Sequence, residues 1–427
     1  MSGERAGAPA VRRLREENLR AVLERAWDAA GHAAPPAGDG AGGGAADGGA
    51  GGGAGGGAGG GRGDGALTGS DLMAATGLSR ATVHDVCEEL IERGWLRELD
   101  DARASGAAYV KGRPARRYAL RARAGVVVGV DAGVGRLSAA VADLRGTALG
   151  RASVRVDHDH ERTPVAQRLE ALERTALAAL DDAGAGAGEV LAAAVGVPAP
   201  VGADGRTAFR GNAYWEFTNP GISAHLQRRL GWRAVTDNDA NLAALAEEHR
   251  GHGRAVRHHV TLLTGERFGA GIVADGRLLR GAHGGAGEMR YLDLVSGVGS
   301  ADGVARTLRE LTGARGGEGA PEQVLAAAAA GDRAALGAVR AAGRRLTRVV
   351  ATLASLVDTE RVVLAGALAA SAGPLVEQVR RELPRFLEEP RPEVLASRLG
   401  ADVVVLGAVD RAVREVRERA LELHPLP

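Results

Sequence analysis

The sequence predicts an α/β protein in two parts, a short helical region followed by a longer body of alternating strands and helices. Outside a glycine-rich stretch, the first 123 residues are mostly helical in pattern. Beyond them, apolar runs of strand length such as Val126–Asp131 and Val260–Thr264 are separated by helical patterns such as Thr163–Asp181. Strands that alternate with helices are typical of α/β folds. At 427 residues, the chain is long enough for roughly two or three units.

Composition narrows the class of protein. The net charge is +1, so overall charge neither requires nor excludes nucleic acid. Cys87 is the only cysteine, which rules out an intramolecular disulfide and a cysteine-based metal cluster and fits a reducing compartment. The charged N-terminus and the lack of a long apolar window predict neither a signal peptide nor a membrane span. We therefore expect a cytoplasmic protein with no membrane partner.

Two short helices around a glycine predict a helix-turn-helix in residues 67–93. Thr68 or Ser70 can cap a first helix over Asp71–Ala75, Gly77 lies at the turn, and Ser79 caps a second helix. The second helix of such a motif offers its first turns to a DNA major groove. A plain helical hairpin is the alternative interpretation. The apolar stripe of the second helix is predicted to be Val83, Val86, Leu90 and Ile91, and its candidate DNA contacts are Ser79, Arg80, Thr82 and His84.

Segments on either side complete the predicted DNA-binding region. An amphipathic helix is expected over residues 11–30, with an apolar stripe of Val11, Leu14, Leu19, Val22, Leu23 and Ala26. Residues from about 37 to 65 are almost entirely Gly and Ala with a few Asp. Nothing in that stretch can form a core, so we expect a disordered insertion between two helices that belong together.

A basic wing is predicted after the second helix. Strands beginning at Gly94 and ending at Leu120 flank a segment that holds seven basic residues and no acid between Ala102 and Arg123. Such a local patch is an electrostatic footprint for DNA phosphates. An extended Arg-Pro segment can also enter a minor groove. Arg113 and Arg116 are therefore candidate DNA contacts, with a solvated linker as the alternative for the charge run.

Polar residues follow the predicted strands of the body. Asp131 ends the first buried strand, and Asp239 lies between a strand over Ala234–Thr236 and a helix. The strand over Val260–Thr264 is followed by a glycine turn, a hairpin signal and a loop of small residues that ends in Glu288. This order of elements is suited to holding a polar small molecule. An ordinary β-meander, and for Asp239 a simple helix cap, are the alternatives.

These motifs resemble those of the ROK family, whose name joins repressor, open reading frame and kinase. The sequence GLSRATV at 77–83 is similar to the helix-turn-helix of the family's repressors, and residues 258–291 resemble its sugar-kinase signature. The resemblance covers nearly all of the chain outside the insertion. It implies a winged helix-turn-helix at 1–123 and an actin-like ATPase/sugar-kinase fold at 124–427. That fold would have two lobes, a hinge near residue 240 and a C-terminal helix returning to the first lobe.

The same resemblance implies a set of site residues. Asp239 occupies the position of the family's catalytic base, and Tyr291 and Asp302 occupy those of a sugar-contacting His and Glu. The implied sugar ligands are Asn212, Asn238, Asp239, Glu288, Tyr291 and Asp302. The implied phosphate-turn positions are Asp131 and Gly133 in a first turn and Gly265 and Gly269 in a second.

The sequence departs from the kinase pattern where nucleotide and zinc would bind. The family's kinases carry Thr and Lys at the positions of Gly135 and Arg136, and Thr-Gly at those of Glu266 and Arg267. A carboxylate at position 266 would repel a nucleotide phosphate. The zinc-binding His is replaced by Tyr291, and the cysteines that complete that site are absent, so neither zinc nor ATP with magnesium is expected.

The implied function is therefore that of a regulator. We expect a repressor that binds a double-stranded DNA operator as a homodimer or homotetramer and senses a sugar or sugar derivative through a degenerate kinase-like body. An active ATP-dependent sugar kinase that carries a DNA-binding domain is the alternative. A ligand-independent DNA-binding protein with a decayed body is the third interpretation.

Overall fold

Residues 7–31, 65–99, 116–157, 159–313 and 320–425 are described by the computed structural model. They divide into a first unit, Met1–Gly125 with Arg417–Pro427, and a second unit, Val126–Val416. The predicted Gly/Ala insertion and Arg113 lie outside the described residues, apart from Gly65. Among the helices that these ranges contain, none is long and apolar enough to cross a membrane.

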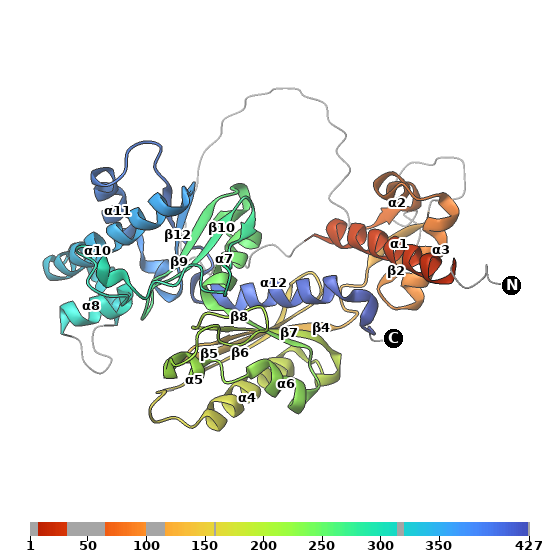
Figure 1. Ribbon diagram of the computed structural model, residues 1–427, viewed down its shortest axis with the longest axis horizontal. Coiled ribbons are helices and arrows are strands. Elements are labelled where there is room, and N and C mark those ends of the chain that lie inside the picture. The colour runs from red at the N-terminus through yellow and green to blue at the C-terminus, as the bar shows by residue number, and fades with distance from the viewer. Residues whose placement is uncertain (1–6, 32–64, 100–115, 158, 314–319, 426–427) are drawn as a thin grey trace. The chain divides into compact units, whose positions relative to one another are not determined.

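The first unit holds three helices and a small antiparallel sheet (Figure 1). Thr68 and Asp71 form a capping box at the start of α2, and Ser79 caps α3 through the backbone N–H of Thr82. Gly77 ends α2 with φ +71°, a conformation that favours glycine. The predicted helix-turn-helix is confirmed, and β2 and β3 pair beside it as a wing requires. The elements are α1 (Gly7–Ala30), β1 (Leu67–Thr68), α2 (Gly69–Thr76), α3 (Arg80–Glu92), β2 (Leu96–Leu99) and β3 (Arg117–Leu120).

The core of this unit corrects two details of the sequence prediction. The predicted stripe of α3 is buried at Val83, Val86 and Leu90, whereas Cys87 is buried with them and Ile91 is only half-buried. In α1, Val11 and Leu14 are exposed by 68% and 59%, because the first turns of that helix extend past the core. The buried part of the predicted stripe is Leu19, Val22, Leu23 and Ala26.

The first lobe of the second unit is a five-stranded sheet in the order β6-β5-β4-β7-β8. Strands β4, β7 and β8 are parallel, and β5 and β6 extend the sheet antiparallel on one side. Helices α4 and α6 cover one face and α12 the other (Figure 1). The elements are β4 (Val126–Ala132), β5 (Arg136–Ala142), β6 (Ala148–Arg155), α4 (Val165–Ala183), β7 (Val190–Val197), α5 (Ala213–Thr218), α6 (Ile222–Leu230) and β8 (Ala234–Asn238).

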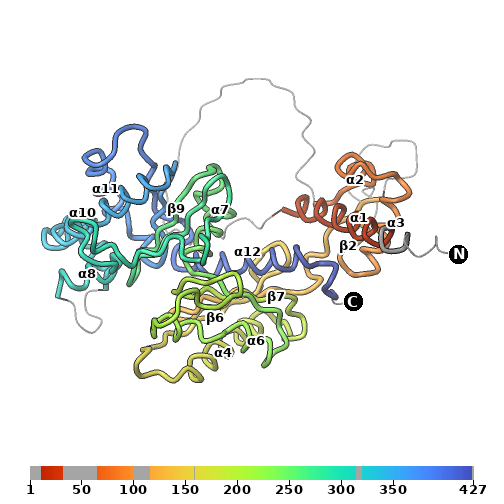
Figure 2. Tube along the Cα trace, in the orientation of Figure 1, coloured from red at the N-terminus to blue at the C-terminus, as the bar shows by residue number. Residues whose placement is uncertain are grey.

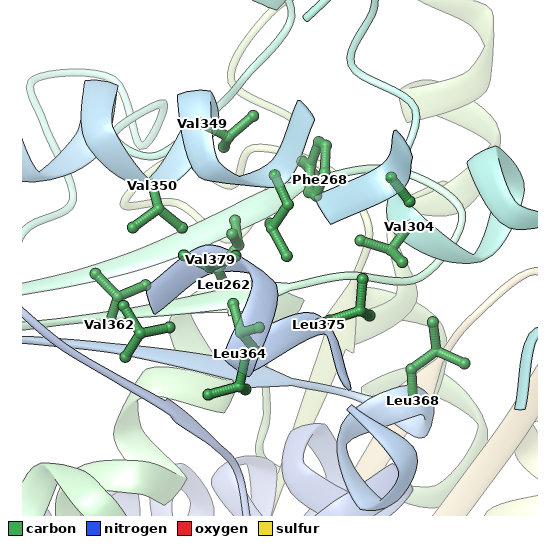
Figure 3. Packing of buried hydrophobic residues seen from close by; sticks show 14 of the residues in the cluster. Leu262, Phe268, Val304, Val349, Val350, Val362, Leu364, Leu368, Leu375 and Val379 are labelled. Carbon is green, nitrogen blue, oxygen red and sulfur yellow. The ribbon is translucent and has the colours of Figure 1, made fainter. Parts of the chain in front are cut away.

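The second lobe is built on another five-stranded sheet, in the order β11-β10-β9-β12-β13. Strand β12 is parallel to both of its neighbours, and β9, β10 and β11 form an antiparallel meander. One face is packed by valines and leucines from the helices between β11 and β13, around Leu262, Val350 and Leu364 (Figure 3). The elements are α7 (Asp239–Arg250), β9 (His259–Leu263), β10 (Gly269–Ala274), β11 (Arg277–Leu278), α8 (Val304–Thr312), α9 (Pro321–Ala329), α10 (Arg333–Val357), β12 (Arg361–Ala365), α11 (Gly373–Glu382) and β13 (Glu393–Ala396).

The C-terminal helix α12 (Val403–Glu418) corrects a strand prediction. Its apolar, β-branched start, Val403–Leu406, predicts a last buried strand followed by a helix over Ala408–Leu423, but the structure has one helix that begins at Val403 and ends at Glu418. The run is apolar on every side because α12 packs against β4, β7 and α7 at once, and periodicity cannot distinguish such a helix from a buried strand. Figure 2 traces the chain from the second sheet back into α12.

Two close approaches fix α12 in the first lobe. A methyl group on Gly407 would lie 1.8 Å from the carbonyl oxygen of Leu242 in α7, and one on Gly129 in β4 would lie 2.5 Å from the backbone nitrogen of Val409. Because no side chain separates these backbones, α12 packs in direct backbone contact with both β4 and α7. At the other end of α12, Arg417 pairs with Glu24 and Asp28 of α1, within the first unit.

Candidate functional site

Three carboxyl groups meet where the parallel strands of the first lobe end. Asp131 lies near the end of β4, and Asp239 directly follows β8 as the first residue of α7. The carboxyl ends of parallel strands share one edge of a sheet, which is where ligands bind in open α/β folds. Glu288 comes from the loop after β11, where a β-bridge to Gly269 holds its backbone. The charges of Asp131 and Glu288 both act on Asp239, so the three groups share one site.

Burial raises the pKa of all three carboxyl groups, so they stay protonated to a higher pH than ordinary carboxyl groups do. Burial and, to a smaller extent, the charge of Asp131 raise the pKa of Asp239 to about 8, against the opposing hydrogen bond from the Ala240 N–H. Burial also raises the pKa of Asp131 to about 7, although Arg136 and Arg168 oppose this shift, and it raises the pKa of Glu288. A protonated Asp239 can donate a hydrogen bond to a hydroxyl oxygen. It would have to lose that proton before it could act as a general base.

The two asparagines of the predicted set differ in what they offer a ligand. Asn238 accepts from the Asn241 N–H at 3.1 Å and donates to the Ala199 carbonyl at 3.1 Å, so both ends of its amide hold the start of α7 in place. Asn212 caps α5 by accepting from the Trp215 N–H at 3.1 Å. No hydrogen-bond partner of its amide NH2 group is found among the described residues, so this group can donate to a ligand. Asn238 therefore positions the neighbouring Asp239, and Asn212 is suited to direct contact.

A buried residue that the sequence analysis missed holds the first phosphate turn in place through hydrogen bonds. Arg168 of α4 is fully buried and donates to the carbonyl oxygens of Ala132, Gly133 and Thr218, while burial lowers its pKa to about 10. These bonds tie the turn after β4 to the end of α5. A signal was present, because Arg168 lies on the apolar stripe of α4 one turn before Leu172, where a charged side chain is unusual.

The second phosphate turn is occupied by ion pairs and hydrogen bonds of the protein itself. Glu266 pairs with Arg309 of α8, and the Glu266 carbonyl accepts from the Gly303 N–H at 2.8 Å. Asp302, which is predicted to contact sugar, accepts from the Ser300 hydroxyl at 2.6 Å and lies 3.5 Å from Arg306. A methyl group on Gly303 would lie 2.1 Å from the Gly265 carbonyl oxygen, so the turn and the start of α8 are in close contact.

The remaining predicted site residues border these two regions. Gly133 lies so close to the Arg136 carbonyl oxygen that a methyl group there would be 2.7 Å from it, and Gly269 faces Ala240 of α7. Tyr291 is 64% exposed, three residues beyond Glu288.

A second missed feature links the sheets of the two lobes beside Asp239. Arg280, which follows β11, donates to both carboxylate oxygens of Asp237 at 2.6 and 2.7 Å. Asp237 belongs to β8 and is 3% exposed. Bidentate pairs of this kind are the stronger and more directional form of ion pair. No local sequence signal joins two residues on different sheets, which is why this pair was not predicted.

The predicted DNA contacts lie at the start of α3 and beside it. Ser79 uses its hydroxyl for the cap, bonding the backbone N–H and hydroxyl of Thr82 at 3.2 and 2.9 Å. Arg80 is exposed in the first turn. Arg116 lies 3.0 Å from the His84 ring and 3.3 Å from Glu98, which brings the base of the wing to the predicted recognition helix.

Comparisons with known proteins agree with these two regions. The sequence model of the ROK family matches residues 127–414, and that of the IclR helix-turn-helix domain matches residues 61–100. The bifunctional enzyme NanE/NanK of Brucella suis is 34% identical over 192 residues, covering 43% of this chain and 35% of that protein. The chain thus spans about a third of the length of this relative.

Relatives with both kinds of function are similar over longer or comparable stretches. A glucokinase of Streptomyces coelicolor is 27% identical over 321 residues, covering 67% of this chain and 98% of the enzyme. The xylose repressor of Caldicellulosiruptor bescii is 26% identical over 217 residues, covering 50% of this chain and 51% of the repressor.

A solved structure is similar over most of the chain. The crystal structure of a ROK family transcriptional regulator, a homologue of the Escherichia coli MLC protein, is 20% identical and covers 82% of this chain and 95% of its own, with a TM-score of 0.61. At that identity it shows the fold alone, a helix-turn-helix followed by the two-lobed body. The family match extends over most of the chain, and the protein is a member of the ROK family.

Proposed function

We propose that the protein is a sugar-responsive transcription regulator that represses its target genes. In this proposal residues 1–123 bind a double-stranded DNA operator as part of a homodimer or homotetramer, and residues 124–427 bind the effector. The observation that carries the proposal is the contrast within the site. Polar groups for a polyol converge around Asp239, whereas the turn that would receive nucleotide phosphate is filled by Glu266 and Arg309.

The proposed effector contacts are hydrogen bonds to sugar hydroxyls. Asn212 supplies an amide donor, Asp239 a carboxyl with a raised pKa, and Glu288 a carboxylate from the opposite lobe. Because Asp239 begins α7 between the two sheets, and the Asp237–Arg280 pair links those sheets beside it, a bound sugar would favour one angle between the lobes about a hinge near residue 240. In a dimer this angle sets the spacing of two recognition helices.

Thermal unfolding against a panel of sugars and ATP tests the proposal. A sugar at about 100 times its dissociation constant should stabilise the protein by about 2.7 kcal/mol. The shift should be lost in Glu288→Gln and kept in Glu322→Gln, an exposed carboxylate on α9. The same sugar should change the affinity for operator DNA in a fluorescence anisotropy assay. If no sugar shifts the melting temperature while DNA still binds, the body is not a sensor.

An active sugar kinase is the second candidate, since Asp239 is retained at the position of the base and a glucokinase is similar over its whole length. It predicts ADP release from sugar and ATP that Asp239→Asn abolishes. The filled second turn favours the regulator, for which no turnover is expected.

A further inference from the structure

A row of aromatic side chains lies beside the candidate sugar site. The ring centres of Phe209 and Trp215 are 6.0 Å apart, and the guanidinium of Arg290 lies 5.9 Å from the centre of Trp215 and 5.4 Å from that of Tyr291. Phe209 and Trp215 come from the first lobe, and Arg290 and Tyr291 come from the loop after β11. We call these four residues the aromatic shelf.

The shelf stands out because aromatic residues are scarce in this chain. They make up 3% of it, four each of Phe, Trp and Tyr, and the shelf gathers three of these twelve residues. Phe209 and Tyr291 remain exposed by 40% and 64%, although rings of this size usually gain stability from burial. Exposed apolar side chains that lie together can mark a ligand-binding surface.

The shelf continues directly from the site. The Trp215 N–H donates to Asn212, and Tyr291 follows Glu288 by three residues. A methyl group on Gly285 would lie 2.9 Å from the Phe209 ring, so the loop that carries Glu288 and the loop that carries Asn212 touch at the shelf. A ligand held by Asn212 and Glu288 could therefore extend onto the shelf without a change of fold.

We propose that the shelf is a subsite for a second sugar ring, so that the effector is a disaccharide or a longer glycan. This inference rests on the proposed sensor function and specifies its ligand. Sugar rings present apolar C–H faces, which pack on aromatic rings, and hydroxyls at their edges, which need donors. Phe209, Trp215 and Tyr291 supply the faces, and the guanidinium of Arg290 supplies the donors.

Calorimetric titration with matched sugars of one and two rings tests the subsite. The probes are glucose with maltose and cellobiose, xylose with xylobiose, N-acetylglucosamine with its β-1,4 dimer, and glucose 6-phosphate. In the wild-type protein, a disaccharide should bind about five- to tenfold tighter than its monosaccharide, because one ring contact adds on the order of 1 kcal/mol. Phe209→Ala should remove this gain and leave monosaccharide affinity unchanged, and Tyr291→Ala should remove the gain as well.

Three further variants test whether the shelf residues bind the second sugar ring or only support the fold. Tyr291→Phe keeps a ring and should keep the gain for the second ring. Leu294→Ala removes another exposed apolar side chain from the same segment, 80% exposed, and should change neither affinity. Glu288→Gln should weaken sugars of both lengths equally.

The outcomes distinguish this inference from the proposed function. Equal affinity for one and two rings in the wild-type protein, or a gain that survives Tyr291→Ala, overturns the subsite and leaves the sensor standing. Tightest binding of glucose 6-phosphate, lost in Arg290→Gln, would replace the sugar subsite with an anion subsite. If no sugar of either length binds, both the sensor and the subsite are overturned.

Discussion

The part of the site proposed to bind sugar, the sugar half, and the part that would receive nucleotide phosphate, the phosphate half, differ in the environment of their acidic side chains. In the sugar half, burial raises the pKa of Asp239 and of Glu288, and the nearby charges of Asp131 and Glu288 contribute to the raised pKa of Asp239. In the phosphate half, Glu266 and Asp302 have partners within the protein, Arg309 and Ser300. This difference indicates that only the sugar half holds its carboxyl groups in an environment that opposes their charge. Hydrogen bonds from a ligand could relieve that unfavourable energy. The phosphate half has satisfied its charges internally.

Arg168 should give the largest effect, because it ties the turn after β4 to the end of α5. Arg168→Met removes the donor to three buried or half-buried carbonyl oxygens in these two segments. We expect the free energy of unfolding to fall by roughly 3–5 kcal/mol. Chemical denaturation measures it, with Arg174→Met on the exposed face of the same helix as the control. A loss below about 1 kcal/mol would show that the turn after β4 and the end of α5 are held in place without Arg168.

Asp239→Asn should stabilise the unliganded protein in a pH-dependent way. The pKa of Asp239 is about 8 in the folded protein, against the ordinary 3.8. Between these values the unfolded chain has already lost the proton that the folded protein keeps, so stability falls as the pH rises. The variant should gain about 3–5 kcal/mol at pH 8 and little at pH 4.

Thermal unfolding across this pH window checks the gain. Asp302→Asn is the matched variant in the phosphate half, and it should lose stability, because the carboxylate there accepts from Ser300. The comparison between the halves fails if both variants are stabilised alike at pH 8.

Removing the ion pair of the second turn should matter less. Glu266 and Arg309 are partly exposed, and exposed pairs contribute up to about 1 kcal/mol. Arg309→Met should therefore shift stability by less than about 1 kcal/mol and should not produce a thermal shift with ATP. A clear ATP shift in the wild-type protein would contradict the view that this half is closed to nucleotide.

The smallest effect is expected from the Gly/Ala stretch. Deleting residues 40–62 removes only Gly, Ala, Asp and Arg residues, none of which supplies apolar area for a core. Operator affinity and the sugar shift should stay within about twofold of the full chain, an energy difference below about 0.5 kcal/mol. A tenfold loss of DNA affinity would assign that stretch a part in binding.

Local signals were sufficient for much of the fold. The hairpin between β10 and β11 was predicted from Asp275-Gly276, and both residues have positive φ, 54° and 69°. The capping residues of the helix-turn-helix were likewise predicted, because each acts within three residues of its partner. Such features depend on chemistry that a short stretch of sequence contains in full.

Long-range features were not accessible in the same way. The pairs Asp237–Arg280 and Glu266–Arg309 each join residues 43 positions apart, and only the packed lobes bring them together. The start of α12 was mistaken for a strand, because a helix buried on all sides loses its apolar periodicity. The family resemblance supplied positions such as Asp239, but not the burial that changes their protonation.

The contact between Gly407 and Leu242 has a consequence for the evolution of such a protein. Any side chain at position 407 would collide with the backbone of α7, whatever ligand the protein binds. Position 407 must therefore remain glycine whatever ligand the protein binds. Position 266, now Glu266, can vary once the protein no longer has to bind a nucleotide. A lineage can therefore exchange a catalytic function for a sensory one while its interior sequence stays recognisable.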